Sequence, residues 1–173
     1  MTTYTRGNTV KLSNNFFLKE FECKCGKCKK TIVDKKLVNS LQLIRNHFGK
    51  PVIINSGYRC AKHNSAVGGA SNSQHTKGKA ADIVIKGVAP SDVAAYAASI
   101  GIMGIGVYKT FTHVDTRDQR AYWGIAFKQS NRKIAEQVIN GAWGVGAQRK
   151  KKLEAAGYNY KEIQALVNEL LRK

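Results

Sequence analysis

The residues best suited to chemistry lie between positions 73 and 115, where His75, Asp82 and His113 occur. Two imidazoles and one carboxylate are a ligand set that proteins use for catalytic zinc, because such a site keeps one position open for water. Asp82 belongs to an otherwise apolar stretch, ADIVI, and a buried carboxylate is costly without a cation or hydrogen-bond donors. These three residues form a candidate metal site.

The spacing of these residues requires a turn and a strand. In one extended strand, His75 and Asp82 would lie about 20 Å apart. Gly78 lets the chain reverse between them, so that both can face one cleft. His113 and Asp115 are two residues apart in an apparent strand, so their side chains share a face. One of the two can bind a metal ion while the other lies beside it.

The surrounding sequence predicts the elements that hold these residues. Apolar residues three and four apart predict a helix over residues 34–48, capped by Asp34 and ended by Gly49. Strands are predicted at 52–54, 80–85, 105–108 and 111–116, and a second helix at 91–100. Because no regular βαβ repeat is present, we expect an α+β domain with a small, mainly antiparallel sheet and flanking helices.

A polar stretch at residues 128–131 separates this pattern from a wholly helical one. We therefore predict a catalytic domain over residues 1–127 and a three-helix module over 132–173, with breaks between helices at Gly141 and Gly157. A module of this size is near the lower limit of independent stability.

The four cysteines are Cys23, Cys25, Cys28 and Cys60, and three of them fall within the six residues CKCGKC. A structural zinc site of all four thiolates, reduced thiols and a later disulfide are three open interpretations. A catalytic thiol is disfavoured, because the spacing implies no histidine partner.

The net charge of +18 would attract polyanions such as nucleic acid, anionic lipid and anionic wall polymers. The basic residues are scattered and form no recognised nucleic-acid motif, so we expect no specific nucleic-acid partner. No apolar run reaches the roughly 20 residues of a membrane span. The N-terminus lacks the apolar stretch of a signal peptide. We expect a monomer made soluble in the cytoplasm.

The sequence SGYRC…SQHTKGKAADI…GIGVY…FTHVDTR resembles the superfamily of zinc D-Ala-D-Ala carboxypeptidases and L-alanyl-D-glutamate endopeptidases, especially the peptidases of phage endolysins. The shared signature S-x-H-x2-G-x-A-x-D is matched by Ser73, His75, Gly78, Ala80 and Asp82. The likeness spans roughly residues 12–124. It implies a fold like that of the hedgehog signalling domain and the D-Ala-D-Ala peptidases.

The resemblance also implies site roles. His75, Asp82 and His113 would bind zinc. Arg59 would hold a substrate carboxylate, a task for which guanidinium is suited. Ser73 and Gln74 would bind the substrate backbone or the zinc-bound water.

The sequence departs from the family pattern at the position of the general base. Several relatives carry an acidic base three residues before the last histidine ligand, where this chain has Thr110. Asp115 is the nearest carboxylate in a matching motif, so we predict that Asp115 is the base. Its alternative role is to orient His113 through the other ring nitrogen.

Residues 134–171 resemble the cell-wall-binding repeat of certain phage lysozymes, which recognises the glycan and muramyl part of peptidoglycan. The resemblance places wall contacts in the W-G-x-G loop and at the next turn, at Trp143, Gly144, Gly146, Arg149 and Tyr158. The alternative is that Trp143 and Tyr158 belong to the core of the module.

Together these patterns predict an endolysin that acts on bacterial peptidoglycan of the host cell wall. It would hydrolyse a peptide bond of the stem peptide or cross-link by zinc-activated water. The alternative is a catalytically inactive, zinc-containing wall-binding protein on the same scaffold. The cofactor expected in both cases is one Zn²⁺, with a second one if the cysteines bind metal.

Overall fold

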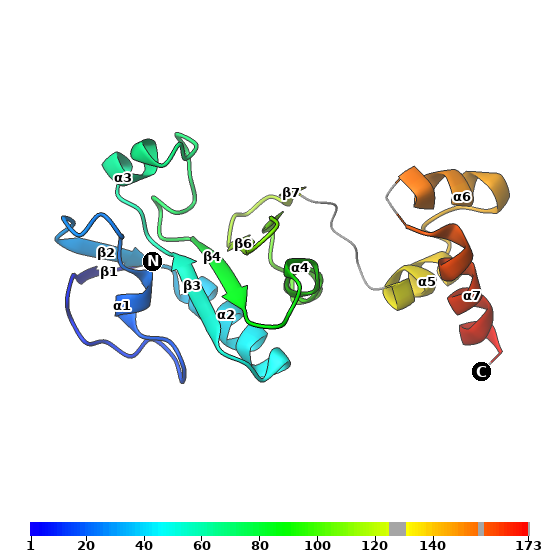
Figure 1. Ribbon diagram of the computed structural model, residues 1–173, viewed down its shortest axis with the longest axis horizontal. Helices are drawn as coiled ribbons and strands as arrows, with labels where there is room; N and C mark the ends of the chain where they lie inside the picture. The colour runs from blue at the N-terminus through cyan, green and yellow to red at the C-terminus, as the bar shows by residue number, and fades with distance from the viewer. Residues whose placement is uncertain (125–130, 156–157, 173) are drawn as a thin grey trace. The chain divides into compact units, whose positions relative to one another are not determined.

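The computed structural model describes residues 1–124, 131–155 and 158–172. The chain divides into two compact units, Met1–Ile125 and Ala126–Lys173, and each is described here by itself (Figure 1). Most of the polar stretch predicted to separate the domains, and the break predicted at Gly157, lie outside the described residues.

A five-stranded sheet forms the centre of the first unit, with strand order β3-β4-β6-β5-β7. All neighbours are antiparallel except β5 and β7, which are parallel. This arrangement confirms the predicted α+β class with a small, mainly antiparallel sheet. The strands are β3 (Val52–Ser56), β4 (Ala80–Ile85), β5 (Gly104–Val107), β6 (Thr112–Asp115) and β7 (Ala121–Gly124). The sequence analysis did not predict β7.

Two helices cover the sheet, α2 (Lys35–Phe48) and α4 (Pro90–Ser99). The Asp34 side chain accepts from the Lys36 amide and caps α2, and Gly49 ends it in the left-handed conformation, as predicted. Helix α2 packs against β3 and α4, and α4 packs against β4, β5 and β6 (Figure 1). The apolar face of α2 and the inner residues of β4 supply much of the core.

The N-terminal part adds elements that the sequence analysis did not predict. Strands β1 (Thr2–Thr5) and β2 (Lys30–Val33) form a separate antiparallel pair. Two short helices, α1 (Leu18–Phe21) and α3 (Ala61–Ala66), lie in the connections. Each is too short to show a clear periodicity in the sequence.

The second unit contains the helices α5 (Asn131–Ile139), α6 (Gly146–Ala155) and α7 (Tyr160–Leu171). Its core is an apolar cluster to which all three helices contribute: Ile134, Ala135, Val138, Leu153, Tyr158, Ile163 and Val167. Within the described residues, no helix has the length and apolar character needed to cross a membrane.

Candidate metal centre and active-site cleft

Two adjacent strands position two of the predicted metal ligands. Asp82 on β4 and His113 on β6 are direct partners in the antiparallel register, which brings their side chains together on one face of the sheet. His75 precedes β4 in a turn that reverses at Gly78, where φ is +69°, as the spacing predicted. The three side chains thus come together although 38 residues separate His75 from His113.

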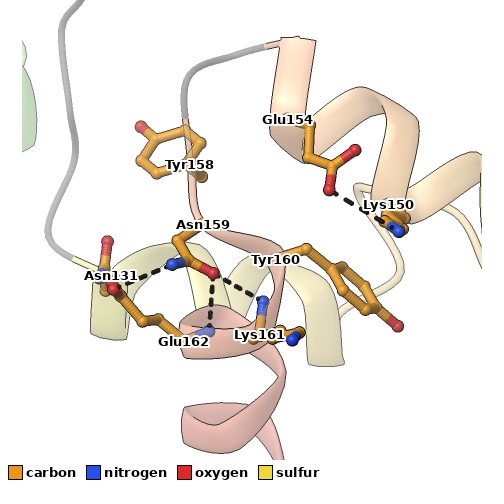
Figure 2. Close-up of a pocket in the computed structure, with 8 residues that line it drawn as sticks. All are labelled: Asn131, Lys150, Glu154, Tyr158, Asn159, Tyr160, Lys161 and Glu162. Atoms are coloured by element: carbon orange, nitrogen blue, oxygen red, sulfur yellow. Dashed lines mark hydrogen bonds and ion pairs between the residues drawn. The ribbon is translucent and has the colours of Figure 1, made fainter.

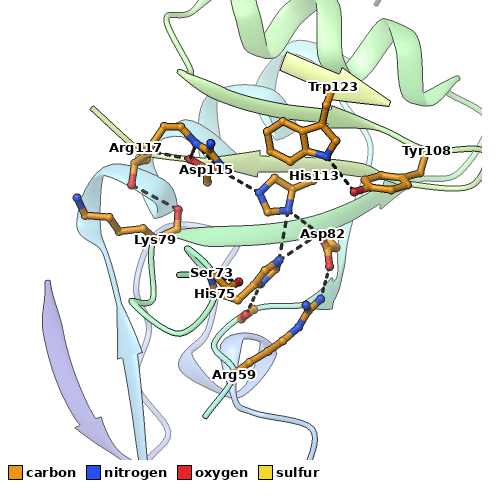
Figure 3. A network of polar contacts seen from close by, with 12 residues as sticks. Arg59, Ser73, His75, Lys79, Asp82, Tyr108, His113, Asp115, Arg117 and Trp123 are labelled. Atoms are coloured by element: carbon orange, nitrogen blue, oxygen red, sulfur yellow. Dashed lines mark hydrogen bonds and ion pairs between the residues drawn. The ribbon is translucent and has the colours of Figure 1, made fainter. Parts of the chain in front are cut away.

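The ligand atoms of these three residues form a small triangle (Figure 3). His75 Nε2 lies 3.2 Å from His113 Nδ1 and 3.3 Å from Asp82 Oδ1, and His113 Nδ1 lies 2.8 Å from Asp82 Oδ1. In a tetrahedral zinc site with bonds of about 2.0–2.1 Å, the ligand atoms are roughly 3.3 Å apart. All three residues are buried. The donor set therefore fits a zinc ion in both chemistry and size.

The second nitrogen of each imidazole has a partner that fixes the ring. His75 Nδ1 lies 2.7 Å from the carbonyl oxygen of Gly57, and His113 Nε2 lies 2.9 Å from Asp115 Oδ2. A carbonyl or carboxylate at that position holds the proton on the far nitrogen, so the near nitrogen can present its lone pair to a metal.

Asp115 lies beneath His113 and does not line the cleft. Its side chain is 0 % exposed. Arg117 donates to Asp115 Oδ1 from its backbone N–H at 3.0 Å and from Nε at 2.8 Å, and to Oδ2 from Nη2 at 2.6 Å. A Cβ atom at Gly104 would collide with this carboxylate, so the glycine leaves space for Asp115. This geometry matches the orienting role that was the alternative for Asp115.

Burial and hydrogen bonding act in opposite directions on the charges of the site. Burial alone would raise the pKa of Asp82, but hydrogen bonds with His113 and His75 outweigh it and leave the pKa below its usual value. Burial would likewise raise the pKa of Asp115, which His113 and Arg117 lower. For His113, burial lowers the pKa, but hydrogen bonds with Asp115 and Asp82 raise it overall. Both carboxylates are thus held as anions.

Arg59 and Ser73, both predicted to bind substrate, lie beside the metal ligands. Arg59 Nη2 donates to Asp82 Oδ2 at 2.5 Å, and Nε donates to Ser56 Oγ at 2.7 Å. Ser73 Oγ accepts from the His75 amide at 3.3 Å. The structure therefore brings Arg59 and Ser73 together with the metal site, and Gln74 lines the same cleft.

The cleft above the metal site has a volume of about 590 Å³, within the range of small-molecule and peptide sites. Its lining comes from the loop before β4, from β4 itself and from the β5–β7 side of the sheet: Arg59, Val67, Gly68, Gly69, Ala70, Asn72, Ser73, Gln74, His75, Asp82, Tyr108, Phe111, His113, Arg117 and Trp123. Arg59 and Arg117 line this polar cleft, and each is paired with a carboxylate, Arg59 with Asp82 and Arg117 with Asp115. Their remaining N–H donors suit a substrate with carboxylates.

The sequence analysis missed the aromatic wall of the cleft. Tyr108 and Phe111 stack with ring centroids 4.3 Å apart, and Trp123 Nε1 donates to the Tyr108 hydroxyl at 2.9 Å. The Arg117 guanidinium lies 5.0 Å from the Trp123 ring centroid. Arg117 is the last residue of the FTHVDTR motif, so its place in that motif could have identified it as a cleft residue. Trp123 could have been found only by recognising the short strand β7.

The four cysteines gather at a second place in the first unit. Their Sγ atoms all lie within 4.8 Å of one another, and no pair is joined as a disulfide. The Lys27 backbone N–H donates to Cys25 and lowers its pKa to about 6, whereas burial raises the pKa of Cys23.

In the second unit, the predicted wall-binding residues make structural contacts. Trp143 packs against the apolar cluster, donates from Nε1 to Gln137 Oε1 at 3.0 Å and meets Tyr158 edge-on at 5.9 Å. Tyr158 is buried in that cluster. Arg149 Nε donates to the Gly144 carbonyl at 2.9 Å and so closes the loop. Trp143 is half-buried and Tyr158 is buried, so both contribute to the packing of this module, and Gly146 is exposed at the start of α6.

A shallow groove of about 940 Å³ lies elsewhere on the second unit (Figure 2). Asn159 caps α7 by accepting from the amides of Lys161 and Glu162. Asn131 Nδ2 donates to Glu162 Oε2 at 2.9 Å, which ties the start of α5 to the start of α7. The groove is lined by Asn131, Lys150, Glu154, Tyr158, Asn159, Tyr160, Lys161 and Glu162. It combines aromatic rings with hydrogen-bonding groups, and the sequence analysis did not find it.

Comparison with known protein families gives a match in each unit. Residues 14–115 match the family described as Peptidase M15. Residues 132–171 match the CW_7 repeat. Both matches agree with the resemblances found in the motifs.

Among curated proteins, the chain is 36% identical over 100 residues to peptidoglycan L,D-endopeptidase MepK of Escherichia coli K12, covering 53% of this chain and 54% of that protein. It is 42% identical over 76 residues to the probable L,D-endopeptidase MepK of Haemophilus influenzae, covering 40% and 41%. It is 52% identical over 44 residues to zinc D-Ala-D-Ala carboxypeptidase of Streptomyces albus G, covering 25% and 17%. The chain thus spans about half the length, or less, of these relatives.

Proposed function

The chain belongs to the Peptidase M15 family, and from this premise we propose that it is a zinc-dependent peptidase that hydrolyses a peptide bond in bacterial peptidoglycan. The observation that carries the proposal is the triangle of ligand atoms from His75, Asp82 and His113 at the base of a polar cleft. The curated relatives are named as peptidoglycan peptidases, which supports the same substrate class.

A zinc ion at this position would supply Lewis acidity toward a peptide carbonyl and toward water. The chain supplies the remaining functions. Asp115 holds the proton of His113 on Nε2 and keeps Nδ1 aimed at the cleft, so we assign it a positioning role rather than that of the general base. Arg59, with five N–H donors, can hold a substrate carboxylate while it stays bonded to Ser56 and Asp82.

The aromatic wall would bind the substrate peptide from the other side. Trp123 Nε1 donates to the Tyr108 hydroxyl at 2.9 Å, which fixes the two rings relative to each other. Ser73 and Gln74 line the cleft from the loop before β4, where their polar groups would pair with the peptide backbone of the substrate. Such contacts would orient the scissile bond before reaction.

We further propose that residues 132–171 hold the enzyme on peptidoglycan and that the protein acts as an endolysin on the cell wall. Attachment would raise the local concentration of substrate. We assign Trp143, Tyr158 and Arg149 to the framework of the W-G-x-G loop, with Gly144 and Gly146 as candidate contacts. The groove beside Tyr160 offers a second contact surface, because an aromatic ring beside hydrogen-bonding groups suits a sugar.

The peptidase proposal is tested by digesting purified peptidoglycan and analysing the fragments by mass spectrometry. The wild-type protein should release products with new peptide termini, whose masses identify the bond. His75→Ala should release none, whereas His47→Ala, which changes an exposed histidine on α2, should digest like the wild type. Intact walls after treatment with the wild-type protein, across several wall chemotypes, would contradict the proposal.

Wall attachment is tested separately by cosedimentation of the full chain with peptidoglycan. Lys161→Ser alters the groove, and Lys151→Ser is a matched change of another exposed lysine, on α6, that does not line it. We expect the first variant to sediment less than the second. Equal sedimentation of the two would exclude the groove as a wall contact.

One observation favours the second candidate function, a zinc-containing wall-binding protein without catalysis. Among the cleft-lining residues of the described chain, Asp82 is the only carboxylate, and it belongs to the ligand set. A cleft without a separate carboxylate has no evident general base. This function predicts bound zinc and wall attachment without release of fragments, so the digestion experiment also distinguishes it.

A further inference from the structure

The cysteine cluster has the arrangement of a closed metal site. Cys25 Sγ lies 3.4 Å from Cys23 Sγ, 3.2 Å from Cys28 Sγ and 3.9 Å from Cys60 Sγ. In a tetrahedral site with zinc–sulfur bonds of about 2.3 Å, the sulfur atoms are roughly 3.8 Å apart. A disulfide would instead bring two sulfurs to about 2.05 Å and leave the other two apart. The four atoms converge on one centre rather than in two pairs.

Backbone N–H groups are directed at the sulfur atoms. The Lys27 amide donates to Cys25, the Cys60 amide to Cys23 and the His63 amide to Cys60, each at 3.4 Å. Donors of this kind stabilise thiolates rather than thiols. They also hold each sulfur in one direction, as the outer partners of metal ligands do.

The surrounding charge is also suited to a metal thiolate. Zinc with four thiolates carries a net charge of −2, and the segment that supplies three of them, CKCGKCKK, also contains four lysines. The side chains of Lys24, Lys27, Lys29 and Lys30 are exposed around the loop, where they can balance that charge without entering the site.

We propose that Cys23, Cys25, Cys28 and Cys60 bind one structural zinc ion, distinct from the ion at the cleft. Four ligands close the coordination sphere, which is the property of structural rather than catalytic zinc. The ion joins two separate segments, the loop between α1 and β2 and the first residues before α3. Each thiol releases its proton when it binds.

The position of Cys60 gives this ion a role in the cleft, and this role rests on the proposed function. Cys60 follows Arg59, whose amide donates to the His75 carbonyl at 3.2 Å. On the other side, the Tyr58 amide donates to the Phe21 carbonyl at 2.8 Å, two residues before Cys23. The zinc ion would therefore anchor the segment that orients both the substrate-binding arginine and the ligand His75.

The site is tested by measuring the metal content of the full chain, purified under reducing conditions with zinc. We expect two zinc ions per chain in the wild-type protein, and one each in His75→Ala and Cys28→Ser. In protein loaded with Co²⁺, wild type and His75→Ala should show intense thiolate-to-cobalt absorption in the near ultraviolet, which Cys28→Ser should lose. Absence of that absorption from the wild-type protein, or a disulfide found by mass spectrometry of alkylated protein, would overturn the site.

A second variant keeps the test decisive if Cys28→Ser does not fold. Cys28→His retains a zinc ligand, so it should keep two zinc ions and show a weaker thiolate absorption from three sulfurs. Cleavage of a soluble wall peptide should fall about 10–100-fold in Cys28→Ser and recover in Cys28→His, as expected for an outer support of a metal centre. Unchanged cleavage by a Cys28→Ser protein that has lost one zinc ion would overturn the role in the cleft.

The outcomes for the two proposals are separable. A wild-type protein that shows the thiolate absorption but releases no wall fragments supports the cysteine site and overturns the proposed peptidase. A wild-type protein that digests walls without the thiolate absorption supports the peptidase and overturns the cysteine site.

Discussion

The two candidate metal clusters of the first unit differ in how the chain builds them. His75, Asp82 and His113 are buried beneath a cleft, and two of them are fixed by the pairing of β4 with β6. The four cysteines come from a loop and a helix start, and backbone amides support them. Three protein ligands leave one coordination position of a tetrahedral zinc ion open to water or substrate, whereas four protein ligands fill all positions. The two proposed roles, a reactive site and a structural site, thus rest on the number of ligands and on how they are supported.

The two clusters also differ in whether their geometry depends on a bound metal ion. The sheet register holds Asp82 opposite His113, and Asp115 and Gly57 fix the two imidazoles through bonds within the chain. The cysteine loop has few regular backbone bonds of its own. We therefore expect the first cluster to keep its shape when metal is removed, and the second to depend on its ion.

The largest effect should come from removing a cleft ligand. His75→Ala should lower wall cleavage by about 10³-fold or more, because a metal ion contributes several kcal/mol of stabilisation to the transition state. Far-ultraviolet circular dichroism should stay unchanged, since the strands do not depend on this side chain. Rates of fragment release measure the effect. Activity within a few fold of the wild type would remove His75 from the site.

The next effect should come from the group behind the ligand. Asp115→Asn keeps the size of the side chain but weakens the bond to His113 Nε2, so zinc affinity or cleavage should fall about 10–100-fold. Titration with a competing chelator measures the affinity, and the rate is measured at saturating zinc. If Asp115 is the general base instead, cleavage should fall far more while zinc affinity stays unchanged.

A smaller effect should follow a change at the rim of the cleft. Arg59→Lys keeps the charge but loses the two-pronged geometry, so kcat/KM should fall about tenfold, mostly through KM. Arg45→Lys on α2 is the matched control and should have no effect. The measurement uses a soluble wall peptide with a free carboxylate. An unchanged KM for that peptide would show that Arg59 does not bind the carboxylate.

The smallest effect concerns the support of the cysteine cluster. Lys27→Pro removes the N–H that donates to Cys25, so zinc affinity there should fall about fivefold, as expected from roughly 1 kcal/mol for a hydrogen bond. Lys27→Ala removes the same side chain but keeps the N–H, and should bind zinc like the wild type. Competition with a thiolate-sensitive chelator measures both. Equal affinities of the two variants would show that the Lys27 N–H does not contribute to zinc binding.

The parts of the site that depend on the spacing of nearby residues could be predicted from the sequence. The helix over residues 34–48, the strand 80–85 and the turn at Gly78 each follow from nearby residues, and so does the grouping of His113 with Asp115. The sequence left two roles open for Asp115, because the choice between them depends on its burial behind His113 and on its bonds with Arg117. Trp123 was missed because β7 has only four residues and pairs in parallel with β5.

The cysteine cluster also depends on a contact between residues far apart in the sequence, which local spacing does not predict. Their types suggested a metal, but Cys60 lies 35 residues from Cys25 in the sequence. The two meet because the segment before α3 contacts the region around α1, where the Tyr58 amide donates to the Phe21 carbonyl and the Cys60 amide to Cys23 Sγ. In the second unit, Trp143 matched a recognition motif by sequence, while its surroundings place it against the core. A motif thus gives the residue type, whereas the burial of its side chain appears only in the folded structure.

The strand order has a consequence for how the protein opens under native conditions. Asp82 and His113 lie on β4 and β6, each of which has a hydrogen-bonded neighbour on both sides, whereas β3 and β7 are edges. We expect the amides of β4 and β6 to exchange with solvent most slowly, and those of β7 much faster. Fraying of β7 would move Trp123 while the ligands stay in register. Under the proposed function, the cleft would thus widen on its aromatic side and admit a bulky cross-linked substrate while the three ligands keep their geometry.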